Sequence, residues 1–421
     1  MTPFASLATK KYRLGSAPFQ PPTITGDFHF GRLYHREQRH CHIGGRVRKL
    51  SDSSGMTYQG SGVDTDQVAQ SLAGLTEQLR QTWTVPKGKI GSVRLDFGLF
   101  ANIIEIGNNK GIAMTTDGVG SKVLVAQRMG KYDTVGIDCI AMNVNDLLCV
   151  GATPLAMVDY IAVQTLEPGC LGELAKGLTE GALRAGISIP GGEIAQVRDV
   201  IKSEAGKDGE GFDLAGSAIG IVDLDRIIVG DRVCAGDAII GIESNGVHSN
   251  GLTLARRAIG QDVTLYDKPF PELGRSLGEE LLQPTHIYTR EILPLLEADS
   301  DIDVKALFHI TGDGFLNLSR VPPPVTFVIE TFPSPPPIFS IIQQLGGIAD
   351  PVMFEVFNMG IGFCLVVPEN QADRTLDLVT KSGKQACRLG RVTDRDPEDW
   401  EVVIHTPDFR LRGKGKSFTA F

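Results

Sequence analysis

The sequence predicts an α+β protein with α/β-type layers, built from two domains that each pack a mixed sheet with helices. With 421 residues, the chain exceeds the length of one ordinary domain. Hydrophobic residues make up 42% and charged residues 22%, which is ordinary for a soluble globular protein. Apolar strand-like runs alternate with helical patterns in both halves, as in sheets covered by helices.

The elements of the first half follow in order along the chain. The first is a helix over 64–82, whose apolar face carries Val68, Leu72, Leu75 and Leu79. The others are a strand over 111–116, a helix over 134–150, a strand over 155–163, a helix over 171–185 and a strand over 213–223.

The second half repeats this alternation. Its expected strands cover 237–243, 325–331, 359–367, 387–393 and 400–405. Its expected helices begin at 251 and 314 and cover 285–297, 338–345 and 371–381. We therefore expect a boundary near 223–236, which gives domains over 56–222 and 223–405 and a tail over 406–421.

Residues 1–55 differ from the rest because they hold nine Lys/Arg and only three Asp/Glu. Four of the eight histidines lie there, but their spacing fits no standard metal site. A basic segment that is disordered or upstream of a true start at Met56 is the favoured interpretation, and a targeting extension is the second.

Composition excludes several classes of protein. The net charge of −9 leaves an acidic body, which argues against a broad nucleic-acid surface. No run of about 18 apolar residues is present, so no membrane span is expected. The seven cysteines form no CxxC motif, which is typical of reduced thiols in a cytoplasmic protein.

The first chemical motif follows the strand that ends at Asp117. Two glycines, Gly118 and Gly120, let the backbone approach a ligand, and Lys122 supplies a point charge for phosphate. A carboxylate beside a phosphate is repulsive unless a cation lies between them. The motif therefore favours a Mg²⁺–nucleotide site with Asp117 on the metal, and the alternative is a turn whose Asp caps a helix.

Further polar residues interrupt the apolar helix over 134–150. Asp138 and Asn145 lie seven positions apart on one face, and Asp146 borders them. Buried carboxylates need a partner such as a metal, although the same residues also fit the wet face of a helix. Glu193 follows two glycines, so Asp117, Asp146 and Glu193 form the candidate magnesium cluster.

These motifs, taken in order, closely resemble those of aminoimidazole ribonucleotide synthetases (phosphoribosylformylglycinamidine cyclo-ligases). The stretches that carry the resemblance are TTDGVGSK, Asp146-x4-Gly151-Ala152-x-Pro154, GGE and SNGVHSNG. The resemblance covers about residues 61–405. Single pieces are shared with selenophosphate synthetases, thiamine-monophosphate kinases, hydrogenase-maturation proteins and formylglycinamidine ribonucleotide synthetases.

The resemblance implies an activity and a set of site residues. ATP and Mg²⁺ would drive closure of formylglycinamidine ribonucleotide to aminoimidazole ribonucleotide, in a homodimer whose N-terminal sheets pair. The implied metal ligands are Asp117, Asp146 and Glu193, and the implied nucleotide-site residues are Gly118, Gly120, Lys122, Asp138 and Asn145. The implied substrate residues, at a helix start suited to phosphate, are Ser244, Asn245, Gly246, Ser249 and Asn250. Asp117, Lys122 and Asp146 are the catalytic candidates, with His248 either a proton carrier or structural.

Two stretches depart from the family pattern. The early loop, often close to GGFGAL in the family, reads RLDFGLF at 94–100, and TAEMPG after GGE is replaced by IAQV at 194–197. Another ATP-dependent enzyme of the superfamily and a non-catalytic scaffold of the same fold remain as alternatives. The absence of cysteine from 86–100 counts against a selenophosphate synthetase. His309 is expected to be structural.

Overall fold

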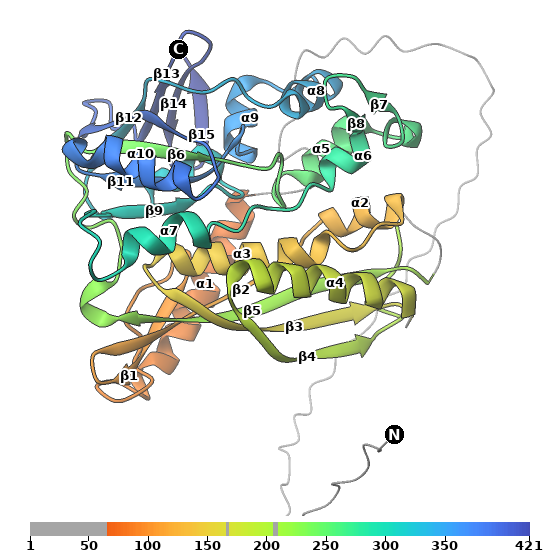
Figure 1. Cartoon of the computed structure of the whole chain (residues 1–421), viewed down its shortest axis with the longest axis horizontal. Helices are drawn as coiled ribbons and strands as arrows, with labels where there is room; N and C mark the ends of the chain where they lie inside the picture. The colour runs from red at the N-terminus through yellow and green to blue at the C-terminus, as the bar shows by residue number, and fades with distance from the viewer. Residues whose placement is uncertain (1–64, 166–167, 205–208) are drawn as a thin grey trace, which may run out of the picture. The chain divides into compact units, whose positions relative to one another are not determined.

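Two sheets, each packed with helices, organise the part of the chain that the structure describes (Figure 1). This structure is a computed structural model, and it describes residues 65–165, 168–204 and 209–421. The predicted α+β class is confirmed. The basic segment 1–55 and the start suggested at Met56 lie outside the described residues.

The N-terminal sheet has five strands in the order β1-β2-β5-β3-β4. They are β1 (Asn102–Gly107), β2 (Lys110–Gly118), β5 (Phe212–Asp223), β3 (Thr153–Val163) and β4 (Ser188–Gln196). Only the β3–β4 pair is parallel. Figure 1 shows α3 (Val135–Cys149) and α4 (Pro168–Ala185) along one face of this sheet. Every residue of α3 except Asp146 is buried, so this helix forms the centre of the N-terminal core.

The opposite face of the sheet carries exposed apolar side chains. Met114, Val158 and Tyr160 are 45–48% exposed. Thr116, Ser217 and Val158 form one cross-strand row on this face, because Ser217 is in register with both of the others. Three large exposed apolar side chains on one sheet face are a candidate contact surface.

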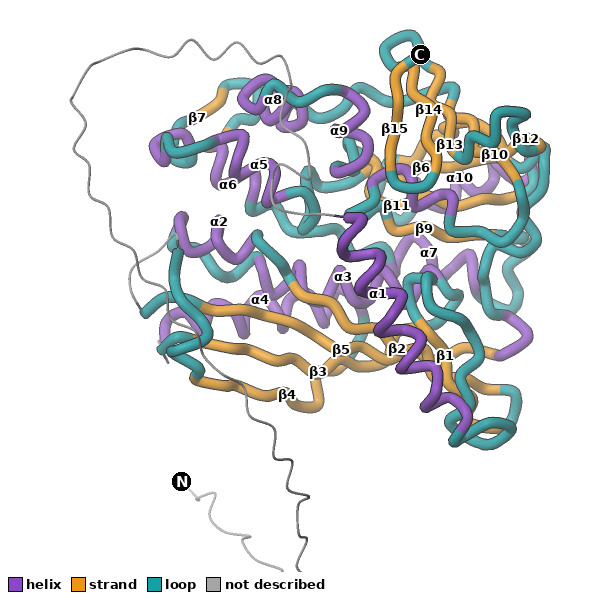
Figure 2. Tube along the Cα trace, turned by 180° about the vertical axis from the view of Figure 1, so that it is seen from behind, coloured by secondary structure: helices purple, strands orange, loops and turns teal. Residues whose placement is uncertain are grey.

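The C-terminal sheet has eight strands in the order β15-β14-β13-β10-β12-β6-β11-β9. They are β6 (Ala238–Glu243), β9 (Ala306–His309), β10 (Val325–Ile329), β11 (Ile361–Val367), β12 (Ala386–Asp394), β13 (Val402–His405), β14 (Arg410–Lys414) and β15 (Ser417–Ala420). Residues 406–421, expected as a tail, instead form the hairpin β14–β15, where the chain ends (Figure 2). The hairpin is anchored because Leu411 and Phe418 are buried in the core.

The helices agree with most of the sequence pattern, but two predicted helices differ and three short helices were not predicted. Besides α3 and α4, the described residues form the helices α1 (Thr65–Arg80), α2 (Lys122–Met129), α5 (Leu252–Ile259), α6 (Leu277–Leu281), α7 (Thr289–Leu296), α8 (Pro337–Gly346), α9 (Asp350–Val356) and α10 (Ala372–Lys381). The helix expected from 314 is a 3₁₀ turn, Gly314–Ser319. The helix expected over 285–297 begins only at Thr289, because the preceding residues 283–288 form neither helix nor strand. Strands β1, β4 and β9 and helices α2, α6 and α9 are not in the predicted list.

The apolar face predicted for α1 does not enter a core. Leu72, Leu75 and Leu79 are 43–54% exposed, while the side chain of Val68 lies outside the description. Among the described residues, no helix combines the length and apolar character that a membrane span requires.

Helices α3 and α4 are in unusually close contact at glycines. A Cβ placed on Gly136 would lie 2.3 Å from the backbone nitrogen of Leu178, and one on Gly177 would lie 2.2 Å from the carbonyl oxygen of Asp133. Neither neighbour is a flexible side-chain end, so the backbones themselves set the separation of the two helices.

We predict that Gly136→Ala lowers the free energy of unfolding by about 1–3 kcal/mol, because the added methyl forces the α3 and α4 backbones apart. Denaturant unfolding measures the change. Gly172→Ala is the matched control, since a Cβ there meets nothing within 4 Å and should be neutral or stabilise α4 by up to about 1 kcal/mol. Equal stability of the wild type and Gly136→Ala would contradict the close-contact interpretation.

Candidate active site

Asp117 lies at the end of β2, on the side of the sheet that faces α3. Its carbonyl oxygen accepts a hydrogen bond from Asn143 Nδ2 at 3.1 Å, and its Oδ1 accepts from the Gly118 N–H at 2.8 Å. Burial, and next the negative charge of Asp146, raise the pKa of Asp117 from 3.8 to about 6. A carboxylate whose ionised form is disfavoured by burial and by a neighbouring negative charge lies where a cation is favourable.

Asp146 is the one partly exposed residue of α3, and it is paired with His309 of β9. The Asp146 Oδ1 and His309 Nδ1 atoms are 2.9 Å apart, and the histidine is fully buried. Asn145 Nδ2 lies 3.4 Å from the other ring nitrogen of His309. The predicted structural role of His309 fits this geometry, since the ring holds the Asp146 carboxylate in place beside Asp117.

The structure places Lys122 differently from the phosphate site that the sequence predicts. The side chain is fully buried, and its Nζ donates to Asp138 Oδ1 at 2.9 Å and to the Gln283 carbonyl at 2.6 Å. Burial lowers the pKa of Lys122 from 10.5, and the Asp138 charge acts in the opposite direction. A buried ammonium requires such a partner, so Lys122 and Asp138 bind each other in this structure rather than face an open nucleotide site.

Two helix N-termini meet near Asp117. Helix α2 starts directly after the Gly118–Ser121 turn, in which Gly120 has a φ of 64°. Helix α5 starts after Gly251, whose φ is 81°. Ser121 Oγ and Thr253 Oγ1, in the first turns of the two helices, are 2.8 Å apart. Helix N-termini present unpaired N–H groups and partial positive charge, so this junction suits anionic ligands.

The loop over 244–251 leads into α5, and its polar side chains are engaged within the protein. The contacts are Ser244 with Gly246 and Asn358, Asn245 with Pro284 and Lys384, Ser249 with Asp138 and Thr285, and Asn250 with Met142. A phosphate at this loop would therefore be bound mainly by backbone N–H groups at the start of α5.

His248 is buried inside the same loop, with a φ of 64°. Its Nε2 accepts from the backbone N–H of Asn245 at 3.0 Å and from that of His286 at 3.4 Å. Burial, followed by the positive charge of His309, lowers its pKa well below 6.5. A neutral ring whose acceptor nitrogen is occupied favours the structural interpretation of His248 over the proton carrier.

Glu193 is not brought together with the other two acids. It is in register with Tyr160, which lies on the exposed face of the sheet, whereas Asp117 faces α3. Glu193 lines a shallow hollow of about 360 Å³ with Val158 and Asp159. The described residues contain no group of three or more His, Cys, Asp or Glu side chains arranged to hold a metal. Of the three predicted ligands, the structure groups only Asp117 and Asp146.

Comparison with known proteins identifies the family of the chain. Residues 99–222 match the family model "AIR synthase related protein, N-terminal domain", and residues 235–402 match the corresponding C-terminal domain. The phosphoribosylformylglycinamidine cyclo-ligase of Methanothermobacter thermautotrophicus is 46% identical over 344 residues, which cover 82% of this chain and 96% of that protein. The chain belongs to this family.

Other relatives and solved structures extend the comparison. The cyclo-ligase of Pyrococcus furiosus is 43% identical over 81% of this chain and 96% of its own length. The thiamine-monophosphate kinase of Stenotrophomonas maltophilia has a TM-score of 0.51 at 18% identity, over 78% of this chain and 94% of its own. AaThiL, solved in complex with AMPPCP and TMP, has a TM-score of 0.53 at 15% identity, over 82% of this chain and 96% of its own. These two structures share the fold.

The segment over 283–288 is absent from the predicted site. Its Thr285 binds Asp138, and its His286 carbonyl accepts from Asn145 Nδ2 at 2.8 Å. The Tyr288 N–H donates to Asn145 Oδ1 at 3.0 Å. The sequence carries no local signal for these contacts, because the segment reads as the start of a helix and its partners lie about 140 residues earlier.

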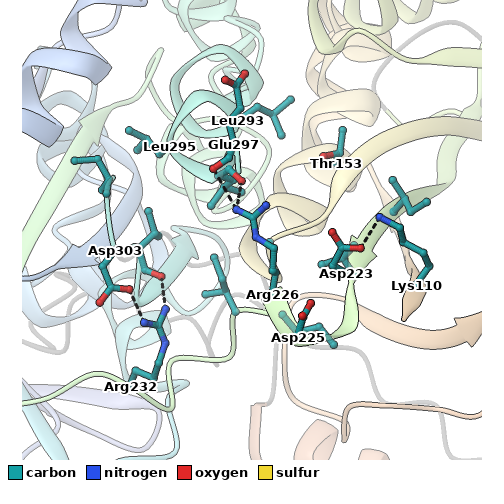
Figure 3. A pocket seen from close by; sticks show the side chains of 18 residues that line it. Lys110, Thr153, Asp223, Asp225, Arg226, Arg232, Leu293, Leu295, Glu297 and Asp303 are labelled. Atoms are coloured by element: carbon teal, nitrogen blue, oxygen red, sulfur yellow. Dashed lines mark hydrogen bonds and ion pairs between the residues drawn. The ribbon is translucent and has the colours of Figure 1, made fainter. Parts of the chain in front are cut away.

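A separate cavity of about 720 Å³ lies between the start of β2 and the end of α7 (Figure 3). Its three cations already have partners: Lys110 pairs with Asp223, Arg232 pairs with Asp303, and Arg226 Nη2 donates to the Leu296 carbonyl at 2.6 Å. Lys110 begins the strand that Asp117 ends, about 24 Å away along β2. We therefore assign the candidate active site to the Asp117 end.

We predict that Asn145→Ala lowers the free energy of unfolding by about 2–4 kcal/mol, because the buried Tyr288 N–H and the partly buried His286 carbonyl lose their partner. Thermal and denaturant unfolding measure this loss. The control is Asn370→Ala, an exposed asparagine, which should change stability by less than about 0.5 kcal/mol. A similar small effect at both positions would show that the 283–288 contacts contribute little.

Proposed function

We propose that this protein uses ATP and Mg²⁺ to close formylglycinamidine ribonucleotide to aminoimidazole ribonucleotide, with release of ADP and phosphate. The observation that carries the proposal is that Asp117, which lies beside the Asp146 charge, directly precedes the turn where the N-termini of α2 and α5 meet. Identity of 46% to a cyclo-ligase over most of both chains supports the same substrate.

The chemistry requires positioning more than a protein nucleophile. The formyl oxygen of the substrate takes the γ-phosphoryl group of ATP, and ADP leaves. The amidine nitrogen then attacks the formyl carbon, and phosphate leaves from that carbon as the ring closes. Phosphoryl transfer is catalysed chiefly by alignment and by stabilisation of charge. Backbone N–H groups at Gly120 and Ser121 and at the start of α5 would orient the phosphates of ATP and of the substrate.

Asp117 and Asp146 would hold Mg²⁺. The raised pKa of Asp117 beside the Asp146 charge supports this assignment, because bound cation offsets the repulsion between the two. Mg²⁺ commonly uses one or two carboxylates and completes its shell with phosphate oxygens and water. When bound, Mg²⁺ would neutralise the negative charge of the phosphates. Glu193, Lys122, Asp138 and Asn145 are not needed as direct ligands in this proposal.

We predict that Asp146→Asn lowers kcat by about 100-fold or more, because the site loses one of its two charges. ADP release with formylglycinamidine ribonucleotide, ATP and Mg²⁺ measures it. Asp373→Asn, at an exposed position of α10, is the control and should keep wild-type turnover. Wild-type ATP hydrolysis indifferent to the substrate would point to another superfamily activity. Mg²⁺–ATP binding without turnover would point to a scaffold.

We also propose a homodimer formed by the exposed face of the N-terminal sheet. The apolar side chains of Met114, Val158 and Tyr160 on that face support this, since a second copy would cover them. The Glu193 hollow borders the same face through Val158, so dimerisation would enclose it.

We predict that Val158→Asp shifts the protein from dimer to monomer, because a charge would be buried in the pairing surface. Sedimentation velocity or light scattering at micromolar concentration measures the mass. Leu183→Asp is the control: Leu183 is 72% exposed on α4, on the opposite side of the sheet, and should leave the dimer intact. A monomeric wild type, or equal dissociation by both variants, would contradict the proposed interface.

A further inference from the structure

The segment over 283–288, which we call the strap, joins α6 to α7 without helix or strand. Its backbone is held almost entirely by side chains from elsewhere. Lys122 Nζ donates to the Gln283 carbonyl at 2.6 Å, and Asn245 Nδ2 donates to the Pro284 carbonyl at 3.1 Å. The strap therefore lies between α2–α3 on one side and the 244–251 loop on the other.

Asp138 is the centre of these contacts. Its Oδ1 accepts from Lys122 Nζ at 2.9 Å, from Ser249 Oγ at 3.1 Å, and from both the backbone N–H (2.7 Å) and the Oγ1 (2.6 Å) of Thr285. All four side chains are buried. Hydrogen bonds to an ionised acceptor are short and strong in such surroundings, so the donors are held in fixed positions.

Two of the three donor residues, Lys122 and Ser249, belong to the segments that make the proposed phosphate junction. Lys122 is the first residue of α2, directly after the Gly118–Ser121 turn. Ser249 lies two residues before Gly251, the residue that caps α5. Thr285 lies outside both helix starts. Its N–H and its hydroxyl nevertheless donate to Asp138 Oδ1, the oxygen that also binds Lys122 and Ser249.

We propose that Thr285 is a positioning residue for the reaction. Through Asp138, it fixes the separation of the α2 and α5 N-termini and thereby aligns the γ-phosphoryl group of ATP with the formyl oxygen of the substrate. This inference rests on the proposed function. Misplacement of about 1 Å in a reacting pair costs on the order of 100-fold in rate, whereas each ligand alone can still bind its own helix terminus.

The test compares Thr285→Val, Thr285→Ser and Thr289→Val. Valine keeps the shape of threonine but removes the hydroxyl, and serine restores it. Thr289 is the matched control, because it is also buried and lies four residues away, but its Oγ1 donates to the Arg184 carbonyl at 3.4 Å rather than to Asp138. We expect Thr285→Val to lower kcat by about 10- to 100-fold with both KM values within threefold of wild type. Thr285→Ser and Thr289→Val should stay within threefold of wild-type kcat.

A second measurement separates this inference from the proposed function. Amide hydrogen exchange should become faster over 244–251 in Thr285→Val and remain at the wild-type rate in Thr289→Val. Unchanged exchange or unchanged kcat in Thr285→Val would overturn the positioning role. A variant whose KM values rise while kcat stays at the wild-type value would overturn it as well. Wild-type protein that lacks substrate-dependent ADP release would overturn the proposed function, while the exchange result would still decide whether Thr285 controls the loop.

Discussion

The buried ion pair between Lys122 and Asp138 constrains the arrangement of both halves of the molecule. Neither side chain reaches water, so each charge is stable only while the other, and the hydrogen-bonding groups around them, are in place. Removing one member of a buried pair typically costs about 3–5 kcal/mol, because the remaining charge is left uncompensated. The strap and the 244–251 loop therefore have one favourable position against α3.

Helix α3 makes this constraint useful for catalysis. One side of the helix contacts β2 through Asn143, which binds the backbone of Asp117. Its C-terminal part presents Asp146, held by His309, to the same carboxylate. Because the helix is buried along its length, these polar groups cannot drift relative to Asp138. The proposed metal site and the proposed phosphate junction thus share one rigid support.

The exposed face of the N-terminal sheet has the opposite character. It exposes the apolar side chains of Met114, Val158 and Tyr160, and it borders the hollow that contains Glu193. Covering this face with a second copy would remove its apolar side chains from water. It would also enclose the GGE stretch at 191–193, which lines the hollow. In that arrangement the motif would belong to the dimer surface and not to the Asp117–Asp146 site.

Local sequence determined much of the fold. The apolar runs and their periods predicted β2, β3, β5, α3 and α4 closely, because those elements bury one face or the whole chain segment in a single core. The position of Asp117 at the end of a strand and before glycines was also predictable from the sequence, since turn chemistry is local. Short elements such as α6 and the hairpin β14–β15 were not, because their stability comes from contacts made after the sheet has formed.

Only the tertiary structure decided what the polar residues do. Lys122 follows two glycines as a phosphate-binding lysine would, yet it is buried against Asp138 and the Gln283 carbonyl. Thr285 carries no motif and lies 147 positions from its partner. A sequence specifies residue types and local spacing, but whether a charge meets a ligand or another side chain depends on which distant segments pack around it, because burial sets the free energy of that charge.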